Sequence, residues 1–157
     1  MGSLAETAGR YRQVIKIQRE TVLGPARVED VEAARVFVRR LRGAEVPEEI
    51  VELWSVSAVV DFSGGAIFAP RAGYEPLPHT GLVEENEEFD PPAGFLYVGT
   101  VGDEWLSWCV EDNAYYQINK VGRSPRFTHA TFEEMFYTKI GNGIEKVFQY
   151  YQQEGEL

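Results

Sequence analysis

Three apolar, aromatic-rich runs separated by very short turns constrain this chain most. The runs span residues 95–101, 104–110 and 114–121, and the breaks between them contain Gly, Asp and Asn. Such short breaks favour antiparallel hairpins, because a parallel connection needs a dozen or more residues. The sequence therefore predicts an antiparallel meander over about residues 95–121. Its middle run is apolar on both faces, so we expect it to be a central strand.

Helical patterns precede the meander. Apolar residues recur at helical spacing over residues 29–42, with acidic residues at the start, arginines at the end and Gly43 as a stop signal. Pro47 then opens a second predicted helix, which ends before a turn at residues 63–65. Its apolar face includes Leu53.

Helical patterns also follow the meander. Thr131 and Glu134 have the spacing of a capping box, which predicts a helix that ends near Gly141. Asn142 and Gly143 indicate a turn before a last helix. Helices on both sides of an antiparallel sheet predict an α+β fold.

The segment between the first helices and the meander has little periodicity. Residues 66–69 read as a short apolar strand. Residues 71–94 are rich in Pro, Gly and Glu, so we expect a long loop. Loops of that length in compact domains often carry function.

Charge is distributed unevenly along the chain. Residues 1–42 contain nine Lys and Arg against five Asp and Glu, a net charge of +4. Residues 43–157 contain six against twenty, a net charge of -14. We therefore predict an N-terminal arm over residues 1–27 and a single domain over residues 28–157.

The sequence allows two placements of the N-terminal arm. It could lie against the acidic body or be an unrelated tail. Its start, residues 2–9, is small and polar and is expected to fray. Residues 11–18 fit neither the helical period nor the strand period cleanly.

Composition excludes several classes of function. A formal net charge of -10 argues against nucleic acid as a partner, because phosphate backbones require a basic face. Cys109 is the single cysteine, so no internal disulfide can form. No apolar run approaches the roughly 18 residues of a membrane span, and no signal-peptide core follows the first residues. We expect a cytoplasmic protein without a membrane partner.

No catalytic or metal-binding motif stands out. Cys109 lies in the most apolar run without a neighbouring cation, so we interpret it as structural rather than as a nucleophile with His79 or His129 as base. Two isolated histidines do not make a zinc motif, and no glycine-rich phosphate loop is present. We predict a protein that is not an enzyme, with no catalytic residue, no metal and no cofactor.

The sharpest local feature is an acidic run that contains one aromatic residue. Five carboxylates fall within seven residues, beside Phe89. A charged rim around an aromatic anchor speeds encounter with a basic protein and supplies a hot spot. Acidic residues of the meander turns extend this surface if those turns point the same way. The predicted partner-binding residues are Glu84, Glu85, Glu87, Glu88, Phe89, Asp90, Asp103, Glu104, Glu111 and Asp112.

Other interpretations compete with this one. The acidic run fits a solvated loop that aids solubility equally well. The arginines at residues 35–42 fit dipole compensation and pairing with the acidic body better than nucleic-acid contact. The alternative function is a small enzyme or small-ligand binder, whose aromatic pocket would be lined by Trp54, Trp105, Trp108, Tyr115 and Tyr116.

The order of motifs resembles the SUKH superfamily. Its front is similar to the helix opened by Val46 to Glu49 and the turn at residues 63–65. Its strand ending in glycine resembles residues 94–99, and its hairpin resembles residues 105–118. Its closing helix is similar to residues 131–136. Val46 stands where the family usually has Leu before Pro47, the Asn of its Asn–Gly turn is missing at residues 63–65, and Asp112–Asn113 lacks a Gly.

The resemblance covers about residues 28–140 and carries implications beyond the fold class. It implies an α+β domain without a shared catalytic motif. Many members are bacterial immunity proteins, which bind and neutralise a cognate toxin that is often a nuclease or a deaminase. Others are intracellular regulatory scaffolds. The resemblance therefore implies a protein-binding domain whose partner is a toxin, with a regulatory scaffold as the alternative. The net charge of -14 over residues 43–157 predicts that such a toxin is basic.

Overall fold

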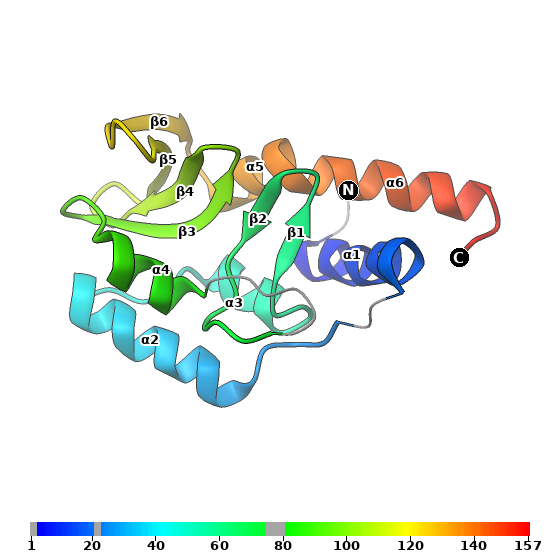
Figure 1. Ribbon diagram of the computed structural model, residues 1–157, viewed down its shortest axis with the longest axis horizontal. Coiled ribbons are helices and arrows are strands. Elements are labelled where there is room, and N and C mark those ends of the chain that lie inside the picture. The colour runs from blue at the N-terminus through cyan, green and yellow to red at the C-terminus, as the bar shows by residue number, and fades with distance from the viewer. Residues whose placement is uncertain (1–2, 21–22, 75–80) are drawn as a thin grey trace.

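The computed structural model describes residues 3–20, 23–74 and 81–157, and it shows an α+β fold built on a six-stranded antiparallel sheet (Figure 1). The order of strands in the sheet follows their order in the sequence. In this described part, no helix combines the length and the apolar character that a membrane crossing requires. The strands are β1 (Val60–Phe62), β2 (Gly65–Ile67), β3 (Phe95–Val101), β4 (Glu104–Cys109), β5 (Ala114–Asn119) and β6 (Pro125–His129).

The predicted meander is confirmed as strands β3, β4 and β5. Trp105 pairs with Thr100 on one side and with Ile118 on the other, so β4 is an interior strand. This result matches the apolar character of both faces of that run. Short turns allow neighbouring strands to pair at once, which is why local sequence was sufficient here.

The sheet also contains strands outside the predicted meander. The predicted strand at residues 66–69 corresponds to β2, which forms a hairpin with β1 through the turn at Ser63 and Gly64. Strand β6 was not predicted, because Pro125 and Arg126 interrupt any apolar alternation. Proline and charge are tolerated there because β6 is an edge strand.

The N-terminal segment forms a core helix, α1 (Leu4–Arg19). The expectation that residues 2–9 fray is wrong for the described residues, because Ser3 and Glu6 form a capping box at the start of α1. The ambiguity at residues 11–18 resolves as helix. The side chains of Leu4 and Tyr11 are buried in the same hydrophobic core as the sheet. Residues 4–19 therefore lie against the body rather than apart from it.

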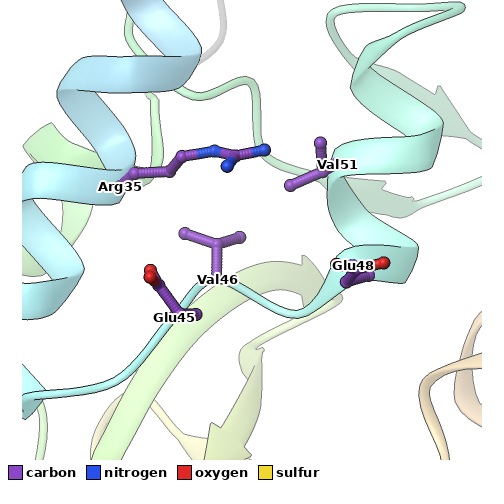
Figure 2. A pocket seen from close by; sticks show the side chains of 5 residues that line it. All are labelled: Arg35, Glu45, Val46, Glu48 and Val51. Carbon is purple, nitrogen blue, oxygen red and sulfur yellow. The ribbon is translucent and has the colours of Figure 1, made fainter.

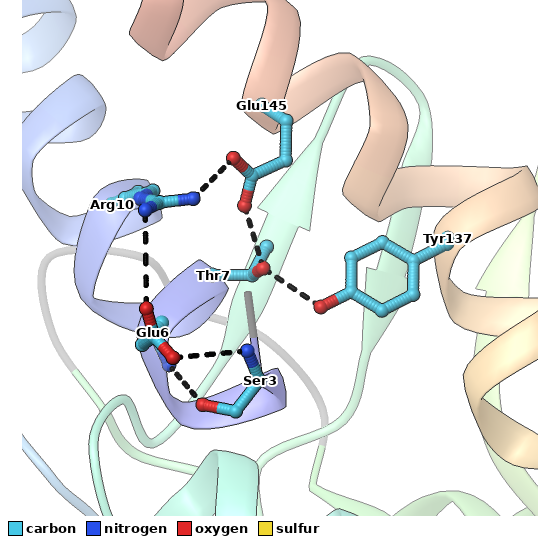
Figure 3. A network of polar contacts seen from close by, with 6 residues as sticks. All are labelled: Ser3, Glu6, Thr7, Arg10, Tyr137 and Glu145. Carbon is cyan, nitrogen blue, oxygen red and sulfur yellow. Dashed lines mark hydrogen bonds and ion pairs between the residues drawn. The ribbon is translucent and has the colours of Figure 1, made fainter. Parts of the chain in front are cut away.

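A polar network fastens α1 to the C-terminal helices (Figure 3). The hydroxyl of Thr7 lies 2.8 Å from the hydroxyl of Tyr137 and donates to Glu145 over 2.6 Å. Arg10 also pairs with Glu145, at 2.7 Å. At the opposite edge of α1, the Tyr11 hydroxyl accepts from the Asp61 N–H and donates to the Asp61 carbonyl. This tyrosine therefore caps the outer edge of β1.

Helices α2 (Val28–Arg42) and α3 (Glu48–Trp54) follow. The first agrees with its predicted range, and Gly43 ends it in the left-handed conformation predicted for a stop, with φ +64°. The second begins after Pro47 as expected but is shorter than predicted. The residues after α3 lead into β1 instead of continuing the helix, and Val59 and Val60 are buried in the core there.

The predicted loop at residues 71–94 is wrong over its second half. Residues Leu82–Phe89 form helix α4, which lies against the sheet near β3 (Figure 1). Leu82 and Val83 are buried, and they provide the apolar contact that holds this acidic helix. Residues 75–80 lie outside the described part of the chain.

The C-terminal helices run without a break. Helix α5 (Phe132–Phe136) continues through a π-helical turn, η1 (Tyr137–Gly141), into α6 (Asn142–Gln153). Thr131 caps α5 as predicted. The predicted turn at Asn142 and Gly143 is wrong, because both residues lie within the continuous helix. Gly141 is a glycine for another reason: a side chain there would collide with the aromatic rings of Phe136 and Tyr137.

The two faces of the sheet have different neighbours. Residues directly opposite one another on paired strands point to the same face, and neighbours along a strand alternate. Trp108 and Tyr115 share the face covered by α5, where Tyr115 meets Phe132 at a ring distance of 5.7 Å. We call this the α5 face. Trp105 and Tyr97 point to the opposite face, which α4 covers and which we call the α4 face.

Candidate protein-binding surface

Helix α4 is anchored to the sheet by the side chain of Asn86. Its amide accepts from the Tyr97 N–H and donates to the Tyr97 carbonyl, each at 2.9 Å. It also donates to the Leu82 carbonyl within α4. This contact lies beside an irregularity in the pairing of β3 with β4, between Tyr97 and Gly99. The asparagine thus pairs with β3 as a further strand would, and fixes the helix on the sheet.

Glu85 forms the second anchor. Only 7% of Glu85 is exposed, and its carboxylate accepts a hydrogen bond of 2.9 Å from Trp105 Nε1. The Trp105 ring is in turn stacked on Tyr97, with centroids 4.1 Å apart. Glu85 was predicted to bind a partner, but its carboxylate is directed into the protein.

Glu84 is also used within the chain. Its carboxylate accepts from Arg71 Nε at 3.1 Å and from the Ala72 N–H at 3.0 Å. The structure therefore separates the acidic run into two sets. Glu84 and Glu85 hold α4, whereas Glu87, Glu88 and Asp90 are exposed.

Phe89 lies between Glu88 and Asp90 in sequence and is itself partly exposed. Its ring packs on Trp105 at 5.5 Å between centroids, and 38% of the residue remains exposed. Within the described residues, no hydrogen bond or ion pair engages the carboxylates of Glu87 and Glu88. We call Glu87, Glu88, Phe89 and Asp90 the acidic ridge.

Arg123, from the turn between β5 and β6, fixes the end of the ridge. Its Nη2 atom donates to the carbonyls of Phe89 and Asp90, both at 2.6 Å, and to the Tyr97 hydroxyl at 3.2 Å. Its guanidinium also lies 5.8 Å from the centroid of the Trp105 ring. The last carbonyls of a helix lack partners within the helix, so an arginine donor stabilises that end. Sequence reasoning did not identify Arg123.

The predicted acidic residues of the meander turns do not form one surface. Asp103 and Glu104 lie beside the turn after β5, where the Lys120 N–H donates to the Asp103 carbonyl. Glu104 pairs with Arg126 at 2.9 Å. Consecutive turns of a meander lie at opposite ends of the sheet. The turn that carries Glu111 and Asp112 is therefore at the other end of β4 from Asp103.

Asp112 is nevertheless held in a defined position. Its carboxylate accepts from the Tyr116 hydroxyl at 2.5 Å and from the Ala114 N–H at 3.1 Å. The hydrogen bond from Tyr116 lowers the pKa of Asp112, and the same bond raises the pKa of Tyr116 to about 12. Asp112 therefore stays ionised and Tyr116 stays protonated near neutral pH.

The five rings of the predicted aromatic pocket do not meet. Trp54 is buried and donates to the Phe68 carbonyl at 2.8 Å. Trp108 and Tyr115 point to the α5 face, whereas Trp105 and Tyr116 point to the α4 face. The prediction that these five rings line one pocket is therefore wrong.

The arrangement around Cys109 offers no dyad with His129. Cys109 is buried and pairs with Ala114, whereas His129 pairs with Tyr115, the next residue of β5. The two side chains therefore point to opposite faces of the sheet. Burial lowers the pKa of His129. His79 lies outside the described residues.

A cavity of about 330 Å³ lies between α2 and α3 (Figure 2). Arg35 extends across it toward Val51, and Val46 forms its floor with Glu45 on the rim (Figure 2). Glu45 is engaged by Arg39, whose Nε lies 3.0 Å from the carboxylate. Arg39 therefore pairs with a carboxylate as the sequence predicted, whereas Arg42 donates to the carbonyls of Phe95, Pro91 and Pro92 instead.

Comparisons with known proteins leave the family open. No family model matches the chain, and no curated protein matches it.

Proposed function

We propose that this chain is a non-enzymatic protein-binding domain of the immunity type, which neutralises a basic toxin by binding and occluding it. The acidic ridge is the observation that carries this proposal. Glu87, Glu88 and Asp90 are exposed carboxylates that flank a partly exposed aromatic residue in sequence, on a helix that two buried hydrogen-bonding side chains anchor. The resemblance to the SUKH superfamily supports the same function.

The physical basis is electrostatic attraction followed by anchoring. A net charge of -10 attracts a basic protein, and exposed carboxylates raise the rate of encounter. Phe89 supplies exposed apolar area beside these carboxylates in sequence. Because α4 is already fixed on the sheet, little conformational freedom is lost upon binding. A nuclease is a suitable partner, since an enzyme that holds phosphate is itself basic.

The test is capture of a partner from a lysate of the native cell at low salt, followed by elution with a salt gradient. The bait proteins are the wild type, the triple variant Glu87→Gln, Glu88→Gln, Asp90→Asn, and a matched control, Glu133→Gln, Glu154→Gln, Glu156→Gln. The control removes the same charge from exposed sites elsewhere. We expect a basic protein to elute earlier from the ridge variant than from the control.

Toxicity decides the class of partner. If the captured protein is toxic and co-expression of this chain restores growth, the immunity function holds. A captured protein without toxicity indicates a regulatory scaffold instead. Equal elution from the ridge variant and the control would remove the ridge from the proposal.

A further inference from the structure

Three aromatic side chains form a continuous row on the α4 face of the sheet, outside the area that α4 covers. Phe95 of β3 contacts Tyr116 of β5 edge-on at 5.1 Å between centroids, and Tyr116 contacts Phe127 of β6 at 5.7 Å. We call Phe95, Tyr116 and Phe127 the aromatic ladder. Edge-to-face contacts fix ring orientations, so the ladder is a preformed surface.

The ladder is open to solvent at its outer end. Phe127 is 54% exposed, and both Phe95 and Tyr116 are partly exposed. Helix α5 packs on the opposite face through Tyr115 and Phe132. An exposed aromatic row beside a charged group is unusual enough to indicate a binding surface.

The charge beside the ladder is negative and fixed. Asp112 is hydrogen-bonded to the Tyr116 hydroxyl, and Glu111 is exposed next to it. The chain itself shows how its rings accept cations, because Lys120 Nζ and the Arg123 guanidinium lie 5.7 and 5.8 Å from the centroid of the Trp105 ring. An aromatic face beside a carboxylate matches a guanidinium, which stacks on rings and pairs with carboxylates at the same time.

We propose that the aromatic ladder and Asp112 bind an arginine side chain of a partner protein. The guanidinium stacks on Tyr116 or Phe127 and pairs with the Asp112 carboxylate. This inference rests on the proposed protein-binding function and assigns it a second contact, distinct from the acidic ridge. Arginine is preferred over lysine, because the planar guanidinium is less strongly hydrated and stacks on a ring.

The experiment is an NMR titration of the aromatic signals with a short glycine–serine peptide that carries one central arginine. The same peptide with lysine is the chemical control. The proteins are the wild type, Phe127→Ala and Asp112→Asn. Tyr150→Ala removes another exposed ring, and Glu133→Gln removes another exposed charge. Thermal unfolding checks that each variant is folded.

We expect saturable shifts of the Tyr116 and Phe127 signals. Phe127→Ala should weaken arginine-peptide binding about threefold to fivefold. Asp112→Asn should weaken it about twofold to fivefold. The two control variants should match the wild type, and the lysine peptide should bind less tightly.

Four outcomes would overturn the proposal: no saturable shift at the ladder, equal binding of the lysine peptide, equal loss in the control variants, or equal loss in the ridge variant. The titration uses no protein from the cell, so its failure leaves the acidic ridge untouched. Conversely, failure to capture a basic protein would not change the peptide result. The ridge variant serves as a further check, because equal loss there would show that only bulk charge matters.

Discussion

Helices α1 and α4 are both held by polar side chains that reach a distant part of the chain, yet they end in different environments. In α1, Thr7 and Arg10 meet Glu145, and Tyr11 caps the edge of β1, so the helix is fastened on two sides (Figure 3). In α4, Asn86 and Glu85 fasten the helix to the sheet and Glu84 and Arg123 hold its two ends, but Glu87 and Glu88 remain exposed. Polar anchoring thus completes the core in one case and orients a surface in the other.

The largest effect is expected from Asn86→Ala, which breaks the anchor of α4. The substitution leaves the N–H and the carbonyl of Tyr97 without this partner, so we expect a loss of about 2–4 kcal/mol in the free energy of unfolding. Chemical denaturation measures the loss. Asn142→Ala, at an exposed helical position, is the control. A loss below about 1 kcal/mol would show that apolar contacts alone hold α4.

Tyr11→Phe tests the anchor of α1 with a smaller expected effect. The hydroxyl exchanges two hydrogen bonds with the backbone of Asp61, so its removal should cost about 1–2 kcal/mol. Tyr150→Phe, whose ring is exposed, should cost nothing measurable. An equal loss in both variants would contradict the capping of β1.

The effect of Tyr11→Phe on the free energy of unfolding should depend on pH. Burial raises the pKa of Tyr11 from 10.0 to about 12. A raised pKa favours the protonated form in the folded protein, so this contribution to stability is complete below pH 10 and is lost as the pH rises toward about 12. The difference in stability between wild type and Tyr11→Phe should therefore shrink over that range. Denaturation at a series of alkaline pH values measures it.

Arg123→Gln sharpens the comparison at the end of α4. It should cost about 0.5–1.5 kcal/mol, because it removes the donor to the Phe89 and Asp90 carbonyls at an exposed site. Hydrogen exchange should speed up in the last turn of α4 while α1 stays protected. Arg126→Gln removes an equal charge from the neighbouring strand and should leave α4 unchanged. Unchanged exchange in Arg123→Gln would mean that the ridge is not fixed by this arginine.

The smallest effect is expected from the double variant Glu87→Gln, Glu88→Gln. Both carboxylates are exposed and neither has an ion-pair partner among the described residues, so stability should change by less than about 0.5 kcal/mol. The measurement is again chemical denaturation. A larger loss would place these residues among the anchors of α4 rather than on its free face.

Sequence patterns correctly predicted the elements whose stability depends on residues close in sequence. The meander and α2 depend on turns, caps and periodicity within a few residues, and both were found as expected. Helix α4 was missed because its stabilising partners, Tyr97 and Trp105, come later in the chain. The helix that passes through Gly141 was predicted to end there, because glycine commonly ends a helix. In the structure, this glycine instead allows close packing against the Phe136 ring, a contact that the sequence pattern does not indicate.

The candidate surface could be predicted only in part, because it also depends on residues that are distant in sequence. Charge and Phe89 marked the acidic run, but burial of Glu85 depends on Trp105, which lies 20 residues away. Asn86 offered one signal: it is the single uncharged polar residue inside the run, and such a residue is suited to pair with backbone groups in the interior. Arg123 offered none, since its left-handed backbone and its contacts arise only from the tertiary fold.

The order of strands in the sheet has a consequence for folding during translation. Each strand pairs with the one synthesised just before it, so the sheet can assemble stepwise as the polypeptide emerges. Helix α1 is made before the strands of this sheet, and Tyr11 can reach β1 early, but Thr7 and Arg10 receive Glu145 only when α6 has been made. The side of α1 that meets α6 therefore stays uncovered until then and is available to a chaperone while the sheet is being synthesised.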